Sequence, residues 1–225
     1  MRTFLSLGAL LMLVGLYSPE AKAQGRAVSL QVFYDELAPY GDSWRPNAGP
    51  DFRPYYTNGR WVMTEYGNTW VSDYDWGWAP FHYGRWYFDD YDGWIWVPDT
   101  TWGPAWVDWR SGGGYYGWAP LSPGFSININ IGPRYYPNNY WVFIPQRCFY
   151  YPNYQSYWYP SRNVTIIRQT TIINNVYVDR GNRNVRYYSG PRADDIRRAT
   201  RQRVPVYRVA DTDRPSSARV ERGTV

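Results

Sequence analysis

The sequence predicts a mainly β protein, in which repeated antiparallel hairpins form a small domain rich in tryptophan and tyrosine. Three observations indicate this class. Aromatic residues make up 20% of the 225 residues, with 14 Trp and 24 Tyr, and such rings favour strands. The 20 Gly and 18 Pro argue against long helices. A segment of about 26 residues recurs in the first half, as expected for supersecondary units that stack on one another.

Residues 1–23 have the pattern of a secretory signal peptide. Arg2 precedes an apolar run over residues 4–16, and small residues ending at Ala23 fit a cleavage site. The run is shorter than the roughly 20 residues that span a bilayer, which favours a cleaved signal over an anchor. We therefore expect an exported protein, in the periplasm or at the cell surface, with no transmembrane segment in the mature chain.

Residues 24–121 are expected to form the Trp-rich β domain, beginning with an alternating strand at 28–32. The stretch GRWVMTEYGNTWVSDYDWG starts at Gly59 and recurs, with one insertion, as GRWYFDDYDGWIWVPDTTWG from Gly84. In each copy, two strand-like runs flank a turn that contains Gly with Asn or Asp. This arrangement predicts a hairpin per copy.

The tryptophans of the repeat are expected mainly to build a core, because aromatic rings bury large areas. Trp70 and Trp96 occupy equivalent positions in the middle of strands, so both are predicted to be buried. A last fragment, YGWAP at 116–120, echoes WGWAP at 76–80. Exposed rings that serve as stacking platforms remain the alternative.

The second half is predicted to be less regular. Residues 122–162 are rich in Tyr, Pro and Asn, and we expect an irregular segment packed on the core, with strands only at 127–131 and 141–144. Residues 163–209 are expected to form an extended β segment, a short helix and a last strand. The β segment, 163–178, is apolar on both faces, so the chain could self-associate through this edge.

The C-terminal helix is predicted from its charges. Asp194 and Asp195 would lie in its first turn, arginines follow them, and Pro205 would end it. Residues 210–225 are polar and are expected to be a disordered tail.

The charge of the chain is divided unevenly. Residues 24–125 carry 6 Arg and 12 acidic residues, whereas residues 126–225 carry 16 Arg and 6 acidic residues. Arginine binds carboxylates and phosphates through its planar fork and stacks on aromatic rings. Because export separates the protein from nucleic acid, we expect envelope polysaccharide or another envelope protein as partner, and no nucleic acid.

Residues with catalytic or metal-binding potential are sparse. His82 is the only histidine, which excludes a multi-His metal site, and its imidazole is expected to bond to backbone among aromatic rings. Cys148 is the single cysteine, and we expect it to be a small buried hydrophobic residue rather than the nucleophile of a pair with His82. A disulfide between two chains remains an alternative. The acidic run at 89–93 does not fit a calcium loop and favours a hairpin turn.

Other carboxylates could serve a hydrolase, but Asp73 and Asp99 both end a strand before a turn, which favours turn capping. The Gly-rich stretch 110–117 lacks the lysine of a phosphate-binding loop and favours a hairpin loop. We therefore expect no catalytic residue, no metal and no cofactor.

A ligand-binding site is predicted at the WGWAP segment. In an extended segment Trp76 and Trp78 would share one face, Asp75 could accept hydrogen bonds from sugar hydroxyls, and His82 lies nearby. These four residues form the predicted glycan site, because binding sites place a few polar groups around apolar walls.

The motifs WGWA-x-x-HYGRW, W-x-PAWV-x-W and YYGWAPL, all within residues 66–123, resemble an uncharacterised family of secreted bacterial proteins with a tryptophan-rich domain of unknown function. The later stretches RNVTIIRQTTIINNVYV and GPRADDIRRATRQRVPVYRV resemble companion segments of that family, so the likeness covers about residues 30–210. It implies a bacterial exported protein, in some relatives joined to envelope-signalling domains. It implies no reaction and no ligand.

The function expected from the sequence is that of a non-catalytic exported cell-envelope protein with a structural or interaction role. The alternative is a module that binds glycan or envelope polysaccharide through exposed Trp and Tyr. A hydrolase based on carboxylates is less favoured.

Overall fold

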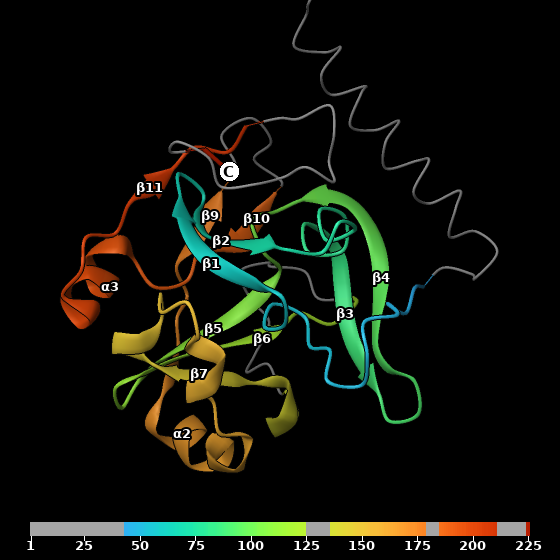
Figure 1. Ribbon diagram of the computed structural model, residues 1–225, viewed down its shortest axis with the longest axis horizontal. Helices are drawn as coiled ribbons and strands as arrows, with labels where there is room; N and C mark the ends of the chain where they lie inside the picture. The colour runs from blue at the N-terminus through green and yellow to red at the C-terminus, as the bar shows by residue number, and fades with distance from the viewer. Residues whose placement is uncertain (1–42, 125–135, 179–184, 211–223) are drawn as a thin grey trace, which may run out of the picture.

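The computed structural model describes residues 43–124, 136–178, 185–210 and 224–225. The mainly β fold predicted from the sequence is confirmed, and three hairpins follow one another along the chain (Figure 1). Their strands are β1 (Gly59–Thr64) with β2 (Gly67–Ser72), β3 (Tyr83–Asp89) with β4 (Gly93–Trp102), and β5 (Val107–Gly112) with β6 (Tyr115–Pro120).

Short strands from the second half extend these hairpins into sheets. The sheet orders are β11-β1-β2, β3-β4, β7-β6-β5-β8 and β10-β9. Pairing is antiparallel except that β11 joins β1 in parallel. The added strands are β7 (Val142–Pro145), β8 (Thr171–Ile172), β9 (Val176–Val178), β10 (Arg186–Tyr188) and β11 (Val206–Tyr207).

Each hairpin carries one pair of tryptophans directly opposite each other on its two strands. The pairs are Trp61 with Trp70, Trp86 with Trp96, and Trp109 with Trp118. All six side chains are buried, with exposed fractions of 0–3%, so the predicted burial of Trp70 and Trp96 is confirmed. The repeat therefore has a third member, of which the sequence pattern showed only the fragment at 116–120.

The three tryptophan pairs meet in one aromatic core. The ring of Trp61 lies 4.7 Å from that of Trp109 and packs edge-on against Trp118 at 5.5 Å, which joins the first and third hairpins. Phe81 lies 6.0 Å from Trp70 and 5.8 Å from Trp86, which joins the first and second. Offset and edge-on ring pairs of this kind add about 0.5–1.5 kcal/mol each beyond area burial.

Two glycines at equivalent positions of the repeat allow this close packing. A Cβ at Gly59 would lie 2.5 Å from the ring of Trp70, and a Cβ at Gly84 would lie 2.5 Å from Nε1 of Trp96. Since no side chain fits there, the glycine of each GRW motif is required for the packing of the tryptophan on the partner strand of the same hairpin. The same residue type thus recurs with the same ring contact.

Residues 136–162 form an irregular segment with one strand, β7, which lies one residue beyond the predicted 141–144. Tyr154 is buried in it, packs 6.2 Å from Trp118, and donates a hydrogen bond to the Tyr56 carbonyl oxygen at 3.0 Å. Its short helices are η2 (Asn138–Tyr140), η3 (Gln146–Cys148), η4 (Tyr154–Tyr157) and η5 (Pro160–Arg162). Cys148 is buried, as expected.

The prediction of one extended β segment over 163–178 was wrong. Its first seven residues form helix α2 (Asn163–Gln169), and only β8 and β9 are strands. Asn163 anchors the helix start, because its buried side-chain amide donates to the carbonyl oxygens of Asn138 and Trp141 at 2.9 and 2.7 Å. These tertiary bonds outweigh the strand preference of the β-branched residues that follow. The edge proposed for self-association is therefore reduced to the short strands β8 and β9.

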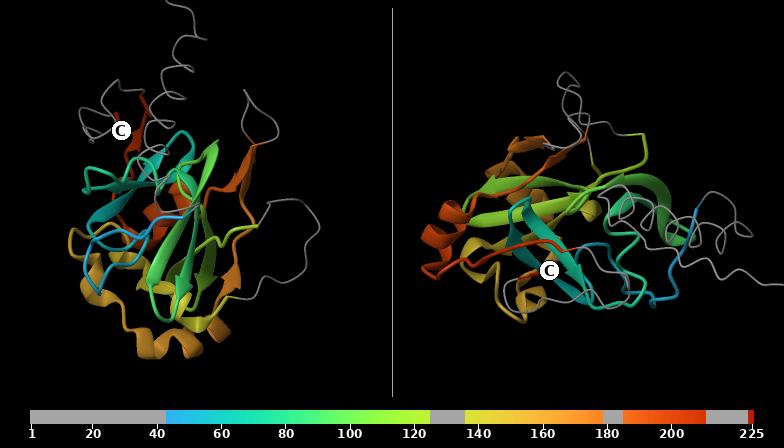
Figure 2. Two further views of the ribbon diagram at one scale, coloured as in Figure 1. Left: turned by 90° about the vertical axis from the view of Figure 1, so that its right-hand side faces the viewer. Right: turned by 90° about the horizontal axis from the view of Figure 1, so that it is seen from above.

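The C-terminal helix is confirmed as α3 (Ala193–Thr200), which buries Ile196. Its predicted end at Pro205 was wrong, because Arg201 adopts the left-handed conformation and ends the helix earlier. Seen from the side, α2 and the short helices before it gather at one end of the molecule, away from β11 (Figure 2). No helix in the described ranges is both long and apolar enough to cross a membrane.

Several predictions lie outside the described residues: the signal peptide at 1–23, the strands at 28–32 and 127–131, and residues 211–223 of the tail. The last residue is described. The backbone N–H of Val225 donates to the Arg208 carbonyl oxygen at 2.7 Å, so the C-terminal end returns to the chain beside β11.

Candidate functional site

The four residues of the predicted glycan site lie on consecutive turns, not on a strand. The segment 75–82 therefore does not place Trp76 and Trp78 on one face as an extended chain would, and that part of the prediction was wrong. Asp75 is exposed, whereas the two tryptophans and His82 are half-buried. A turn forms here because the chain must pass from β2 to β3 in a short distance, with backbone hydrogen bonds from Ala79 to Trp76 and from His82 to Ala79.

Trp76 and His82 belong to different groups of rings. Trp76 stacks on Tyr74 at 4.4 Å and packs edge-on against Trp44 at 4.9 Å. His82 stacks on Trp102 at 6.0 Å, and its Nδ1 lies 2.9 Å from the Gly103 carbonyl oxygen. The expectation of an imidazole bonded to backbone among aromatic rings is confirmed.

Carboxylates of the repeat have structural partners. Arg60 pairs with Asp73 at 3.1 Å, and the equivalent Arg85 lies 4.0 Å from Asp99. The Arg85 guanidinium also lies 3.6 Å from the centre of the Trp106 ring, and burial lowers its pKa. The repeat therefore copies an arginine–aspartate pair together with its tryptophans.

The acidic run at 89–93 is the turn of the second hairpin. One carboxylate oxygen of Asp89 accepts the backbone N–H groups of Tyr91 and Asp92, at 2.8 and 2.9 Å, and these bonds lower the pKa of Asp89. The hairpin turn predicted for this run is confirmed. Over the described ranges, no three potential metal ligands cluster together.

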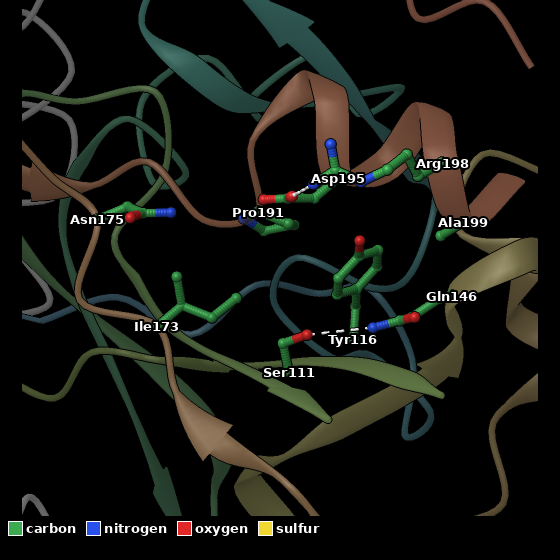
Figure 3. A pocket seen from close by; sticks show the side chains of 9 residues that line it. All are labelled: Ser111, Tyr116, Gln146, Ile173, Asn175, Pro191, Asp195, Arg198 and Ala199. Atoms are coloured by element: carbon green, nitrogen blue, oxygen red, sulfur yellow. Dashed lines mark hydrogen bonds and ion pairs between the residues drawn. The ribbon is translucent and has the colours of Figure 1, made fainter. Parts of the chain in front are cut away.

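The structure brings together a different set of polar residues, between the third hairpin and α3. They line a pocket of about 450 Å³, which we call the α3 pocket (Figure 3). Its volume falls within the range of about 300–1,000 Å³ that is common for small-molecule sites. The lining residues are Ser111, Tyr116, Gln146, Ile173, Asn175, Pro191, Asp195, Arg198 and Ala199.

The floor of the α3 pocket is built on the hairpin of β5 and β6. Ser111 and Tyr116 are directly opposite each other in the register, so both side chains stand on the same face. Gln146, at the start of η3, donates from Nε2 to Ser111 Oγ at 3.1 Å, and its backbone N–H donates to the Gly114 carbonyl oxygen at 2.8 Å. The positions of these three side chains are thus set by sheet register and by hydrogen bonds.

The roof is one face of α3. Asp195, Arg198 and Ala199 follow a spacing of three and four residues, which places them on one side of the helix. Asp195 and Arg198 form an ion pair, and Figure 3 shows both charged groups above the Tyr116 ring. The approach to the helix is fixed by Asn68, whose buried side-chain amide donates to the Pro191 carbonyl oxygen at 2.8 Å.

Tyr116 is held as a neutral phenol. Burial and the nearby Asp195 carboxylate raise its pKa to about 12, although Arg198 acts in the opposite direction. With Ser111 and the two side-chain amides of Gln146 and Asn175, the pocket offers uncharged donors and acceptors around one balanced ion pair. Such a lining suits hydrogen bonding to a polar ligand better than nucleophilic attack, because the chain's one histidine lies elsewhere, against Trp102.

The α3 pocket was not predicted. Ser111 and Tyr116 flank a Gly-rich turn, and Asp195 with Arg198 has helical spacing, so each pair was visible in the sequence. Nothing in the sequence indicates that the two pairs meet, because they lie about 80 residues apart and are joined only by packing.

Comparison with known proteins gives a similarity to one family and no activity. Residues 30–125 match the model of a family of unknown function, DUF6600, a range that holds all three hairpins. No curated protein and no solved structure matches the chain. Over residues 30–125 the chain is therefore similar to DUF6600, a family of unknown function.

Proposed function

We propose that the protein is a non-catalytic, exported component of the cell envelope that binds envelope polysaccharide through the α3 pocket. The observation that carries this proposal is the lining of that pocket, where hydroxyl, phenol and amide groups from three separate elements converge. Sugar hydroxyls both donate and accept hydrogen bonds, so they match such a mixed set of groups. Export is supported by the signal-like pattern of residues 1–23.

The tryptophans support this proposal because they form the core on which the α3 pocket is built. Nine of the 14 are buried, and the remaining five are half-buried. A rigid aromatic core beneath the third hairpin holds Ser111 and Tyr116 in place, and a fixed site loses less conformational entropy on binding. The tryptophan content is thereby explained by packing, without a stacking role for most of the rings.

A second candidate function uses the predicted site at Asp75, Trp76, Trp78 and His82. Trp76 and Trp78 are half-buried beside the exposed Asp75, so part of each ring is accessible to a sugar. This arrangement supports glycan binding by stacking, at a place distinct from the α3 pocket.

Calorimetric titration of the full mature chain separates the two candidates. The probes are soluble peptidoglycan fragments and lipopolysaccharide oligosaccharides. At the α3 pocket, we expect Ser111→Ala and Tyr116→Phe each to weaken binding about two- to tenfold, the cost of one hydrogen bond. Ser156→Ala is the matched control, because Ser156 is an exposed serine of η4.

The results of these titrations distinguish the two candidate sites. Weakening by Ser111→Ala and Tyr116→Phe, with Trp78→Ala unaffected, supports the α3 pocket. Loss of binding in Trp78→Ala alone supports the second candidate. Absence of saturable binding to every probe would remove polysaccharide binding from both.

A further inference from the structure

A second, smaller pocket lies beside β7 and α2. These two elements are labelled in the lower part of Figure 1. Its volume is about 230 Å³, and its floor is apolar, formed by the buried side chains of Phe143 and Ile166. Two arginines, Arg147 and Arg162, lie in its wall together with three tyrosines from two segments of the chain. We call it the Arg–Tyr pocket.

Among the described residues, the arginines of the Arg–Tyr pocket have no compensating charge. Both are exposed, and neither guanidinium has an ion pair or hydrogen bond to any residue that the structure describes. No acidic residue lines the pocket, and residues 122–178 contain four arginines and no aspartate or glutamate. In α3, by contrast, Arg197 and Arg198 are each paired with an aspartate of the same helix.

Two positive charges beside one pocket attract anions, because an anion that binds between the guanidinium groups relieves their mutual repulsion. Arginine also donates two parallel hydrogen bonds to a carboxylate or phosphate, which gives direction as well as charge. The charge therefore indicates an anionic ligand group.

The tyrosines indicate a ring beside that group. Tyr159 is 57% exposed, and the Arg162 guanidinium lies over one face of its ring, 5.5 Å from the ring centre. Tyr115 and Tyr157 are half-buried and complete the wall. At about 30 Å³ per water molecule, the pocket holds roughly eight waters, which is room for one substituted six-membered ring.

We propose that the Arg–Tyr pocket binds an acidic sugar residue, with its ring against the tyrosines and its anionic group between Arg147 and Arg162. The residue would be one unit of an acidic polysaccharide. This site is separate from the α3 pocket, so the inference does not depend on the function proposed there.

The test is calorimetric titration of the full mature chain with matched pairs of probes. Trigalacturonate is compared with galactotriose, and glucose 6-phosphate with glucose, so that carboxylate and phosphate are distinguished. We expect one or both anionic probes to bind saturably, and their neutral counterparts to bind at least tenfold more weakly. Arg147→Gln and Arg162→Gln should each weaken the anionic probe about tenfold, and Tyr159→Ala should weaken it several-fold.

Arg168→Gln is the matched control. It removes the same charge from the exposed face of α2, outside the pocket, and should leave binding unchanged. Circular dichroism confirms that each variant is folded. The proposal is overturned if neither anionic probe binds saturably, or if Arg168→Gln weakens binding as much as Arg162→Gln. It is equally overturned if Tyr159→Ala binds as wild type does, because the ring would then have no part in the site.

Discussion

Replacement of Trp70 by alanine should strongly destabilise the aromatic core. The side chain is 0% exposed and lies between the rings of Trp61, at 5.3 Å, and Phe81, at 6.0 Å. Burial of about 150–250 Å² at about 25 cal/mol per Å² corresponds to about 4–6 kcal/mol. Measured costs of such truncations are about 3–5 kcal/mol, since neighbours relax partly into the cavity. No hydrogen bond to a described residue is lost, because the Trp70 indole N–H has no acceptor among them.

A loss of about 3–5 kcal/mol is a large part of the roughly 5–15 kcal/mol that stabilises a typical domain. The assay is urea unfolding of the mature chain followed by circular dichroism, with the dependence on urea compared between variants. Tyr91→Ala is the control, because Tyr91 is 93% exposed and its loss should change stability by no more than about 0.5 kcal/mol. A Trp70→Ala protein that unfolds at the wild-type urea concentration would refute the core packing described for the hairpins.

Two further predictions concern the equivalent arginines and the buried phenol. Arg85→Met should lower the free energy of unfolding by about 1–2 kcal/mol, because it removes a desolvated cation from the Trp106 ring. Arg60→Met should lower the free energy of unfolding by less than about 1 kcal/mol, since its ion pair with Asp73 is exposed. Equal losses for the two variants in urea unfolding would contradict this difference between Arg85 and Arg60. For Tyr116, the folded-state pKa of about 12 lies above the ordinary value near 10, so its contribution to stability is complete below about pH 10 and is lost as the pH rises towards 12. Tyr116→Phe should therefore lose less stability between pH 9 and pH 11.5 than the wild type, and an identical loss in thermal melts would count against the shifted pKa.

The first two hairpins could be predicted because their turns and their GRW motifs are local signals. The third was only partly visible, since β5 contains Asp108 and Trp109 where the other copies have Arg and Trp. Its tryptophan pair depends on register, which brings Trp109 opposite Trp118 and cannot be read from either strand alone. The repeat is therefore more regular in space than in sequence.

The errors of prediction arose where distant residues decide the local structure. The run after Asn163 has the composition of a strand, yet the bonds of Asn163 to Asn138 and Trp141 hold it as a helix. The turn at 75–82 was expected to be extended because its rings alternate, and backbone hydrogen bonds close it instead. Both pockets combine segments that are far apart in the chain, so neither could be inferred from spacing.

The central claim is that the tryptophans form the core and that polysaccharide binds in the α3 pocket. A nuclear magnetic resonance titration of the isotope-labelled mature chain tests it most directly. Soluble envelope polysaccharide is added while side-chain amide and indole N–H signals are followed together. We expect the side-chain amide signals of Gln146 and Asn175 to shift saturably, because both groups line the α3 pocket. The indole signals of the nine buried tryptophans should stay in place. Saturable shifts of the Trp76 and Trp78 indoles, with the Gln146 and Asn175 amides unmoved, would contradict the account.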